Sequence, residues 1–534
     1  MSESNEKYIL AVDLGTSGPK SALVSAHGKI LAHAFVKNDL FLHADGGAEQ
    51  DPGQWWTTVL ESFRMLLAKQ LVPAESITAI CCSSQWSGTV AVDKNGRHIA
   101  NALIWLDSRG SRYIRQITKG FLPIGGYAAV KLWQWVRLTG GAPSHSGKDS
   151  LAHILYIKNM HPEIYKRTWK FLEPKDYINL RLTGRSIASY DSICLHWVTD
   201  NRDINKIVYN DKLVKLSTVE PEKFPELLPA ASVIGTLDKK IAERLGLSPR
   251  VRVVCGTPDM QAAAVGSGAV EDFGAHLYIG TSAWLTCHVP FKKTDIKTSV
   301  ASLPSAIPGR YFAANEQETA GACLTFLRDK VFFPKDRLSD LCAPPDFYGA
   351  LDALADEVPP GSKGLLFLPW LYGERTPVDD RLIRGGFLNL SLSATRAHMV
   401  RAVLEGVAYN SRWLLSAVEK FAGRRLSPIR MIGGGANSDI WCRIHADVLD
   451  REVIKVKDPL LANVRGAGLL ASAALGYIRF EDICGLVETE GIYEPAPANR
   501  QIYDRMFREF KVSYRQTRKT CARLNRSAGT KEED

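Results

Sequence analysis

The sequence contains no long hydrophobic run. None of its apolar segments approaches the roughly 18 residues that a membrane-spanning helix needs. The start of the chain, from Met1 to Lys7, is polar and acidic, unlike the start of a signal peptide. We therefore expect a cytoplasmic protein that has no membrane partner.

Regularly spaced cysteines are missing as well. The ten cysteines are scattered from Cys81 to Cys521, and no two of them have the C-x-x-C spacing. Neither a disulfide framework nor a zinc site is therefore indicated. The chain also lacks low-complexity tracts, and its 45% hydrophobic and 23% charged residues are typical of an ordinary globular protein.

The 534 residues exceed what one hydrophobic core accommodates, because single cores stop growing at about 250 to 300 residues. We expect two domains of similar size, residues 1–270 and 271–534. The boundary is placed next to the polar break from Glu271 to Gly274. Strand-like apolar runs alternate with helical patterns in both halves, which predicts an α/β architecture.

Positive charge is concentrated only near the C-terminal end. The net charge of +10 is otherwise spread along the chain. The cluster falls on a predicted terminal helix and comprises Arg508, Lys511, Arg515, Arg518, Lys519, Arg523 and Arg526. A helix that reads bases usually carries interspersed aromatic residues, so a solvated helix face is favoured over a nucleic-acid or membrane partner.

The tripeptide Gly-Thr-Ser occurs twice, at Gly15 to Ser17 and at Gly280 to Ser282, each time directly after a strand-like run. Each copy predicts a β-hairpin whose bend can hold phosphate through N–H and O–H donors. Only the first copy is preceded by an acid, Asp13, whose carboxylate would hold the Mg²⁺ that neutralises the phosphate. The chance recurrence of common turn residues is the alternative interpretation.

Two further strand ends carry candidate site residues. Asp259 ends the segment Gly-Thr-Pro-Asp, where it could accept a proton from a substrate hydroxyl or cap the following helix. Gly433 to Gly435 form a loop whose backbone could lie against a nucleotide, or that serves as a turn with positive φ. Gly466 to Ala471 match a dinucleotide pattern but follow a loop, so we predict a close-packed helix there.

Gln85, Trp86 and Ser87 follow another strand-like run. An amide beside an indole suits a polyol, because the amide hydrogen-bonds hydroxyl groups and the ring covers the C–H face. A buried tryptophan with a structural glutamine is the alternative interpretation. The segment therefore indicates a polyol site only in combination with its neighbours.

These segments together resemble the FGGY family of carbohydrate kinases over most of the chain, from Tyr8 to Tyr477. The resemblance rests on seven motifs in order, which are DLGTSGPK from Asp13, WLDSR from Trp105, EPKDYINLRLTG from Glu173, GTPD from Gly256, YIGTS from Tyr278, FLPWLYGERTPVDDRLIRGGF from Phe367 and GGGANSDIWCRIHADVL from Gly433. It implies an α/β fold of two actin-like (ribonuclease H-like) domains with a catalytic cleft between them. The chain is most similar to the xylulokinases, but Gln85-Trp86-Ser87-Gly88 replaces their usual Gln-Met-His-Gly, and the stretch from Gly110 to Gly147 is longer than usual.

The resemblance implies ATP- and Mg²⁺-dependent phosphorylation of a hydroxyl group of a small ketose or polyol. Residues 1–270 would hold the sugar and the catalytic base, and residues 271–534 would hold the nucleotide and end in the basic helix. The implied site consists of the base Asp259, the sugar-binding Gln85, Trp86 and Ser87, the metal-binding Asp13, the phosphate-binding Thr16, Ser17, Lys20, Gly280 and Thr281, and the nucleotide-binding Gly434, Gly435 and Asn437.

Two other functions would use the same fold. A non-metabolic actin-like ATPase would hydrolyse ATP without a sugar, which the pocket at Gln85 to Gly88 and the presence of Asp259 disfavour. A sugar-binding regulator with decayed catalysis is disfavoured because Asp13 and Asp259 are both intact. The sequence leaves the oligomeric state open, with a homodimer among the expected assemblies.

Overall fold

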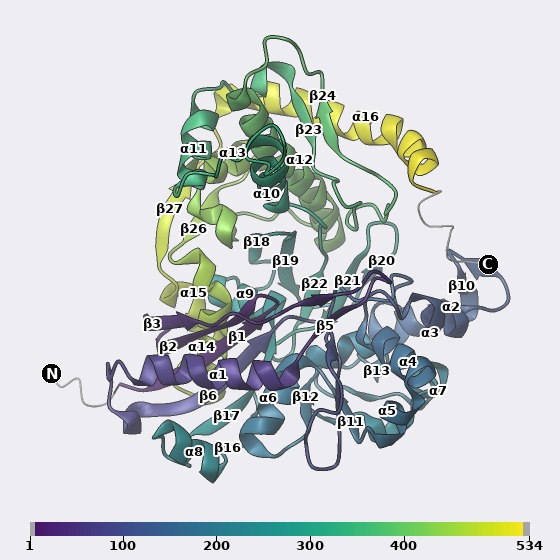
Figure 1. The fold of residues 1–534 in the computed structure, drawn as a ribbon, viewed down its shortest axis with the longest axis vertical. Helices are drawn as coiled ribbons and strands as arrows, with labels where there is room; N and C mark the ends of the chain where they lie inside the picture. The colour runs from purple at the N-terminus through teal and green to yellow at the C-terminus, as the bar shows by residue number, and fades with distance from the viewer. Residues whose placement is uncertain (1–5, 527–534) are drawn as a thin grey trace.

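The computed structural model describes residues 6–526 and contains two large β-sheets, which lie one above the other in Figure 1. The first sheet has six strands in the order β16-β17-β6-β1-β2-β3. Their bounds are β1 (Tyr8–Gly15), β2 (Gly18–Ser25), β3 (Ile30–Phe35), β6 (Ile77–Ser84), β16 (Val233–Thr236) and β17 (Arg252–Pro258). β1 and β2 form an antiparallel hairpin, whereas β6 and β17 continue the sheet parallel to β1.

The second sheet repeats this plan within eight strands, in the order β20-β21-β22-β19-β18-β25-β26-β27. Their bounds are β18 (Ala275–Ile279), β19 (Ala283–Val289), β20 (Thr294–Asp295), β21 (Val300–Pro304), β22 (Tyr311–Ala314), β25 (Ile429–Ile432), β26 (Val453–Val456) and β27 (Thr489–Tyr493). β18 and β19 form the hairpin, and β25 and β26 run parallel to β18. The predicted α/β architecture and the predicted second hairpin are therefore confirmed.

Helices flank both sheets (Figure 1). The longer ones that bear on the site are α1 (Pro52–Leu67), α6 (Pro174–Thr183), α9 (Asp259–Ser267), α12 (Arg396–Ala422), α13 (Asp439–Leu449), α14 (Ala462–Ala474) and α16 (Arg500–Asn525). α1 begins where the Asp51 side chain accepts the Gly53 N–H, with Pro52 at the first helical position. Its buried residues include Trp55, Val59 and Phe63, which lie on one face at helical spacing.

The two halves of the molecule meet where α9 crosses α14. α9 follows β17 and α14 follows β26, so each helix leaves the third parallel strand of its sheet. A Cβ atom at Gly266 would overlap the Ala462 carbonyl oxygen, and one at Gly466 would overlap the Ala262 carbonyl oxygen. Glycine is required at this crossing because the two backbones touch. The prediction of a close-packed helix at Gly466 is confirmed.

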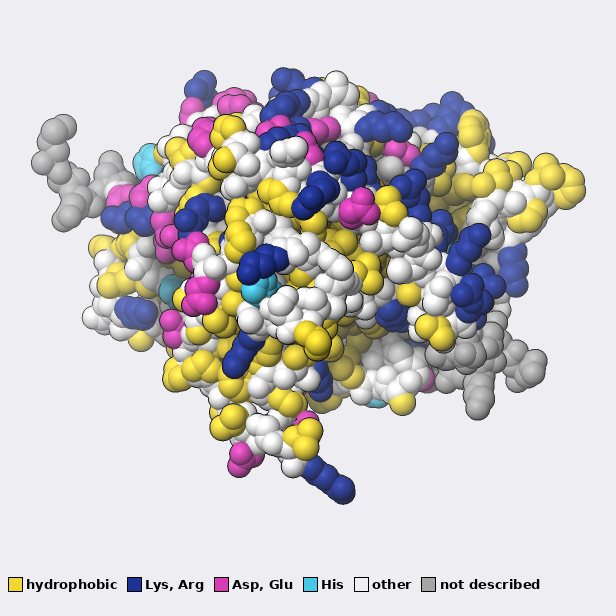
Figure 2. Space-filling model, turned by 90° about the horizontal axis from the view of Figure 1, so that it is seen from above, with side chains coloured by type: hydrophobic (Ala, Val, Ile, Leu, Met, Phe, Trp, Pro, Cys, Tyr) yellow, Lys and Arg dark blue, Asp and Glu magenta, His cyan; other side chains and the backbone are white. Residues whose placement is uncertain are grey.

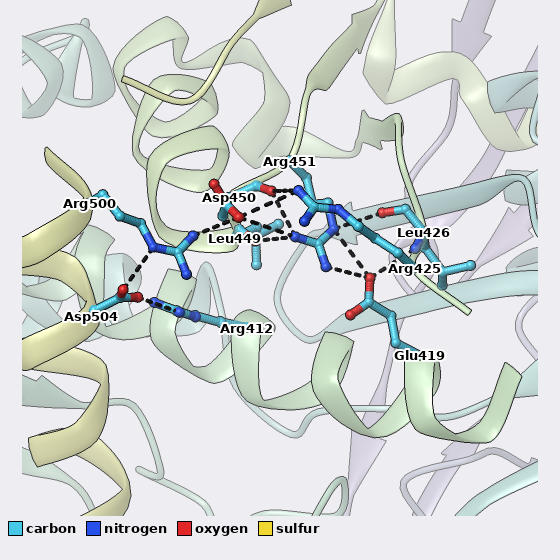
Figure 3. Close-up of polar contacts among 9 residues, drawn as sticks. All are labelled: Arg412, Glu419, Arg425, Leu426, Leu449, Asp450, Arg451, Arg500 and Asp504. Carbon is cyan, nitrogen blue, oxygen red and sulfur yellow. Dashed lines mark hydrogen bonds and ion pairs between the residues drawn. The ribbon is translucent and has the colours of Figure 1, made fainter. Parts of the chain in front are cut away.

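The C-terminal helix α16 is part of the upper half and is held there by ion pairs (Figure 3). Arg500 contacts Asp450 at 2.6 Å and Asp504 at 2.7 Å. Asp504 also pairs with Arg412 of α12. The chain of alternating charges joins the start of α16 to the end of α13 and to the middle of α12, so the basic outer face of α16 belongs to an anchored helix.

The segment between β8 (Ala102–Leu103) and α4 (Ser150–Met160) forms an excursion at the right-hand edge of Figure 1. It consists of α2 (Ser111–Thr118), the short hairpin β9 (Pro123–Ile124) and β10 (Tyr127–Ala128), and α3 (Ala129–Thr139). Among residues 6–526, no helix is both long and apolar enough to cross a membrane.

Candidate functional site

The carboxyl ends of three parallel strands bring the first candidate residues together. β1, β6 and β17 run in one direction, and both Asp13 and Thr257 are in register with Ser83 of the middle strand. Ligands of α/β sheets bind outside such carboxyl ends. Asp13 near the end of β1 and Asp259 directly after β17 therefore lie on either side of β6, at the same edge of the sheet.

Asp13 is a buried carboxylate with one free oxygen. Its side chain is 5% exposed, and its Oδ1 atom has no hydrogen-bond partner among residues 6–526. Burial raises the pKa of Asp13, and the nearby Lys20 ammonium opposes this shift. A buried oxygen without a partner is costly unless a ligand satisfies it, so the site fits a hydrated Mg²⁺ ion. No cluster of three or more His, Cys, Asp or Glu side chains suited to a metal occurs within residues 6–526, so water and phosphate oxygens would complete the coordination.

Asp259 is the first residue of α9 and is half-buried. The helix cap position is taken by Pro258, and the Asp259 carboxylate accepts the Met260 N–H at 2.8 Å. The pKa of Asp259 is raised well above its ordinary value. Burial is the largest cause, and repulsion from the charges of Asp13 and Glu316 adds to it. The charges of Asp13 and Glu316 therefore reach Asp259, so the three carboxylates share one space. A raised pKa makes an ionised carboxylate a stronger base.

Glu316 reaches this space from the second half of the molecule. It forms an ion pair with Arg375, which also pairs with Glu318 at 2.9 Å. Neither Glu316 nor Arg375 was assigned a role from the sequence. Arg375 lies in the motif that begins at Phe367, which could have drawn attention to it, whereas Glu316 lies outside every motif.

Tyr278 is the counterpart of Asp13 in the second hairpin, since each residue stands two positions before its Gly-Thr-Ser. Its ring stacks on Trp284 with 3.9 Å between the ring centres. Burial raises the pKa of Tyr278, with smaller contributions from the negative charges of Asp259 and Asp13. The two hairpins therefore face the same group of carboxylates.

The first Gly-Thr-Ser bend is braced by neighbouring side chains. The Thr16 hydroxyl donates to Gln85 Oε1 at 2.9 Å and accepts from Trp105 Nε1 at 2.9 Å. Ser17 is exposed, and Lys20 Nζ donates to the Leu460 carbonyl at 3.2 Å. The predicted phosphate contact of the Thr16 side chain would have to replace one of its two bonds, whereas Ser17 is open to a ligand.

The second bend is docked on the start of α10 (Ala322–Phe326). The Gly280 carbonyl accepts the Gly321 N–H at 2.8 Å, and the Thr281 carbonyl accepts the Ala320 N–H at 2.9 Å. The Thr281 side chain is exposed. The bend is therefore fixed by its contacts with the start of α10, while its Thr281 side chain stays accessible, as a phosphate-binding turn requires.

The three glycines after β25 have different surroundings. A Cβ atom at Gly433 would crowd the Ile279 carbonyl, and one at Gly435 would overlap the Ile279 side chain. Gly434 has only the tip of Leu460 nearby, at 3.8 Å, and both Gly434 and Asn437 are exposed. Packing against β18 thus explains two of the glycines, while Gly434 and Asn437 are the predicted nucleotide residues that the structure leaves accessible.

The polar groups predicted for the sugar are already hydrogen-bonded within the protein. Gln85 is 2% exposed and its amide nitrogen donates to Gln50 Oε1 at 2.8 Å. Trp86 Nε1 donates to the Ser192 carbonyl at 3.1 Å, and the Ser87 hydroxyl donates to the Lys148 carbonyl. These contacts form a rigid wall behind the Trp86 ring, which is only partly buried. Direct recognition of sugar hydroxyls by the three side chains stays a prediction.

A buried ion pair lies under the loop that carries Asp259. Lys175 and Asp176 are both fully buried and in contact, and Lys175 Nζ also donates to the Cys255 carbonyl at 3.3 Å. Two residues after Cys255 in the same strand, the Thr257 hydroxyl donates to Asp191. The sequence motif containing Lys175 was noted, but its partners next to Asp259 were not predicted. The network fixes the strand end from which Asp259 projects.

Comparisons with known proteins agree with this geometry. The description "FGGY family of carbohydrate kinases, N-terminal domain" matches residues 8–266, and the corresponding C-terminal domain matches residues 275–475. A xylulose kinase of Staphylococcus epidermidis is 28% identical over 97% of this chain and 99% of its own length. A gluconokinase of Bacillus licheniformis is 25% identical over 89% of both chains.

Solved structures give the same result for the fold. A gluconate kinase from Lactobacillus acidophilus superimposes with a TM-score of 0.84 at 23% identity, covering 97% of this chain and 100% of the other. A xylulose kinase from Rhodospirillum rubrum gives a TM-score of 0.80 at 26% identity, with 96% and 100% covered. The two repeated sheets are thus the two actin-like domains of these enzymes. The chain belongs to the FGGY family of carbohydrate kinases.

Proposed function

We propose that Asp259 is the general base of this kinase and that its acceptor is a small ketose or polyol. Membership of the family makes the protein a carbohydrate kinase that uses ATP and Mg²⁺. The observation that supports the site assignment is the convergence of Asp13 and Asp259 at the carboxyl ends of β1 and β17. Asp13, with its unpartnered buried oxygen, is suited to the metal, and Asp259, whose pKa is raised well above its ordinary value, is suited to the proton.

In the proposed mechanism the Asp259 carboxylate takes the proton of the acceptor hydroxyl while that oxygen attacks the γ-phosphoryl group in line. The bond from the γ-phosphorus to the β–γ bridging oxygen breaks, and ADP leaves with that oxygen. Bound Mg²⁺ would neutralise phosphate charge next to Asp13. Ser17, Lys20 and Thr281 would orient the phosphates, and Thr16 and Gly280 would hold the bends that present them. The hydrogen bonds of Gln85 and Ser87 support a role for Trp86 in acceptor binding, because they would keep its ring in place against the acceptor.

We further propose that Gly434, Gly435 and Asn437 border the nucleotide, through the exposed Gly434 and Asn437 and the packing role of Gly435. The domain boundary is proposed between residues 270 and 271. Its support is that β17 is the last strand of the first sheet and β18 the first of the second. Cytoplasmic location and homodimeric assembly remain proposals, which cell fractionation and sedimentation equilibrium would test.

The acceptor can be identified with a panel of D-xylulose, other pentuloses, pentitols, tetritols and gluconate in a coupled ADP-release assay. We expect a ketose or polyol to be phosphorylated, and D-xylulose not to be the best acceptor, because no histidine stands beside Gln85 and the Trp86 N–H already binds Ser192. A clear preference for D-xylulose would contradict the argument from Trp86. ADP release that no acceptor stimulates would instead favour an actin-like ATPase. If no ADP is released with any acceptor of the panel, the result would favour a sugar-binding regulator.

A further inference from the structure

The excursion between α2 and α4 exposes a group of hydrophobic side chains that the kinase site does not use. These residues, here named the apolar hairpin surface, are Phe121, Leu122, Ile124, Val130 and Trp133, with exposed fractions of 86, 62, 58, 67 and 57%. Single exposed hydrophobic residues are common, but five within thirteen positions form a patch of the kind that marks an interaction site.

The hairpin that carries this surface is held rigidly. Gly125 and Gly126 form its turn with φ values of 57° and 88°, which only glycine adopts easily. Below the turn the Tyr127 ring stacks on His145 at 3.9 Å, and the Tyr127 hydroxyl donates to the Pro143 carbonyl at 2.7 Å. The hydrophobic tip is therefore presented to solvent by a fixed base.

The segment that carries the apolar hairpin surface has charged side chains of one sign only. Residues 110–147 contain no Asp or Glu but carry the basic residues Arg112, Arg115, Lys119, Lys131 and Arg137. A groove of about 570 Å³ between α2, α3 and α7 (Asp211–Ser217) is lined by Lys131, Lys212 and Lys215. An anionic group would find three ammonium groups there.

The basic end of α16 lies on the same side of the molecule. Asn525 of α16 donates to the Leu382 carbonyl at 2.9 Å, and the charges of the nearby Arg381 and Asp379 both act on Tyr127 and His145 at the base of the hairpin. Figure 1 places β10 and the end of α16 at the right-hand edge, and Figure 2 shows projecting hydrophobic side chains at that edge with Lys and Arg beside them.

We propose that the apolar hairpin surface docks this kinase on a membrane that contains anionic phospholipids. Phe121, Leu122 and Ile124 would enter the headgroup region, with Trp133 at its border and the basic side chains against lipid phosphates. A second copy of the chain fits less well as the partner, because a two-fold contact would bring together two copies of the basic segment 110–147, which contains no acidic residue. The proposal departs from the expectation that the protein has no membrane partner, which considered a spanning segment and the terminal helix alone; the absence of a spanning helix among residues 6–526 is compatible with both.

The test uses the full chain and vesicles of phosphatidylcholine, with or without about one third phosphatidylglycerol as the anionic lipid. We expect co-sedimentation only with the anionic vesicles, weakened by added salt. The double variant Phe121→Ser, Ile124→Ser should lower the fraction bound about tenfold or more, since it removes two large side chains that would be buried in the headgroup region on binding. Arg115→Glu with Lys119→Glu should weaken binding similarly.

Leu392→Ser is the matched control, because Leu392 is a fully exposed hydrophobic residue in a different region. It should bind vesicles as the parent does, and kcat/KM should be unchanged in every variant. The proposal is overturned if anionic vesicles fail to bind the parent, or if the Phe121 and Ile124 variant binds them equally well. A dimer in sedimentation that this variant abolishes would identify a second copy as the occupant, and retention of RNA or DNA in place of vesicles would identify nucleic acid.

Discussion

In the β1–β2 hairpin the residue two positions before Gly-Thr-Ser is Asp13, whereas in the β18–β19 hairpin it is Tyr278. Both hairpins pair their strands antiparallel. Asp13 and Tyr278 each interact electrostatically with Asp259. The duplicated backbone therefore supplies two similar bends for the proposed phosphate contacts, while one residue difference confines the proposed metal-binding carboxylate to the first bend. The repeated fold places Asp13 and Tyr278 at equivalent positions, and the identity of the side chain decides which of them can bind a metal.

The ends of the third parallel strands differ in the same way. After β17 the acid is Asp259, which is half-buried at the start of α9. After β26 the acid is Asp458, which is exposed and has a left-handed φ of 48° before Pro459. Only the first acid faces the other carboxylates, so the proposed base also belongs to one half alone.

The largest effect is expected from Asp259→Asn, which keeps the shape of the side chain but cannot accept a proton. Turnover should fall about 10²- to 10⁴-fold, with ATP and acceptor binding retained in calorimetry. Asp458→Asn is the matched change in the other half and should leave kcat within about twofold, since an exposed surface acid contributes little. Similar losses in both variants would show that the comparison between the strand ends is wrong.

Asp13→Ala should raise the Mg²⁺ concentration for half-maximal activity by about tenfold or more, because the metal loses a partner held in place by the protein. The measurement is a Mg²⁺ titration at saturating acceptor. Tyr278→Phe changes the equivalent residue without altering charge, so its Mg²⁺ dependence should match that of the parent. An unchanged Mg²⁺ dependence in Asp13→Ala would remove this residue from the metal site.

The joint between the halves gives the next largest effect. Gly466→Ala should lower the free energy of unfolding by about 1–3 kcal/mol, because its Cβ atom would overlap the Ala262 backbone. Gly485→Ala is the control, since a Cβ atom there meets open space and alanine favours the helical backbone. Thermal unfolding should separate the two variants, and equal stability would mean that the helix crossing is looser than described.

The smallest effect is expected in the pH profile of Glu316→Gln. Asp259 must be ionised to act as a base, and repulsion from Glu316 helps to keep its pKa raised. Removing that charge should lower the pKa of Asp259, so the acidic limb of kcat/KM should move to lower pH. Glu318→Gln, which also removes an Arg375 partner, should leave the limb in place. A shift to higher pH in Glu316→Gln would contradict the shared carboxylate space.

Local sequence was sufficient for the repeated hairpin, for Asp259 at a strand end and for the helix at Gly466, because each depends on residues adjacent in the chain. It was not sufficient for the wall at the proposed sugar site. The partners of Gln85, Trp86 and Ser87 lie 35, 106 and 61 residues away. Only the tertiary fold shows that their polar atoms are already engaged.

The glycine loop shows the same limit. Three consecutive glycines predicted a surface for the nucleotide, yet two of them are required by Ile279, a residue more than a hundred positions earlier. Glu316 and Arg375 were missed for a related reason, because their ion pair joins residues 59 positions apart. A residue's role was predictable where its neighbours were local and not where residues distant in the sequence supplied them.

The crossing of α9 and α14 also has the symmetry of a subunit contact. Gly266 meets Ala462 and Gly466 meets Ala262, and in both helices the alanine precedes the glycine by four residues. Such reciprocal pairing is the isologous pattern of identical protomers related by a two-fold axis. A half-length ancestor with one sheet and one such helix would already have possessed a self-complementary surface, and joining two copies into one polypeptide would have required no new interface.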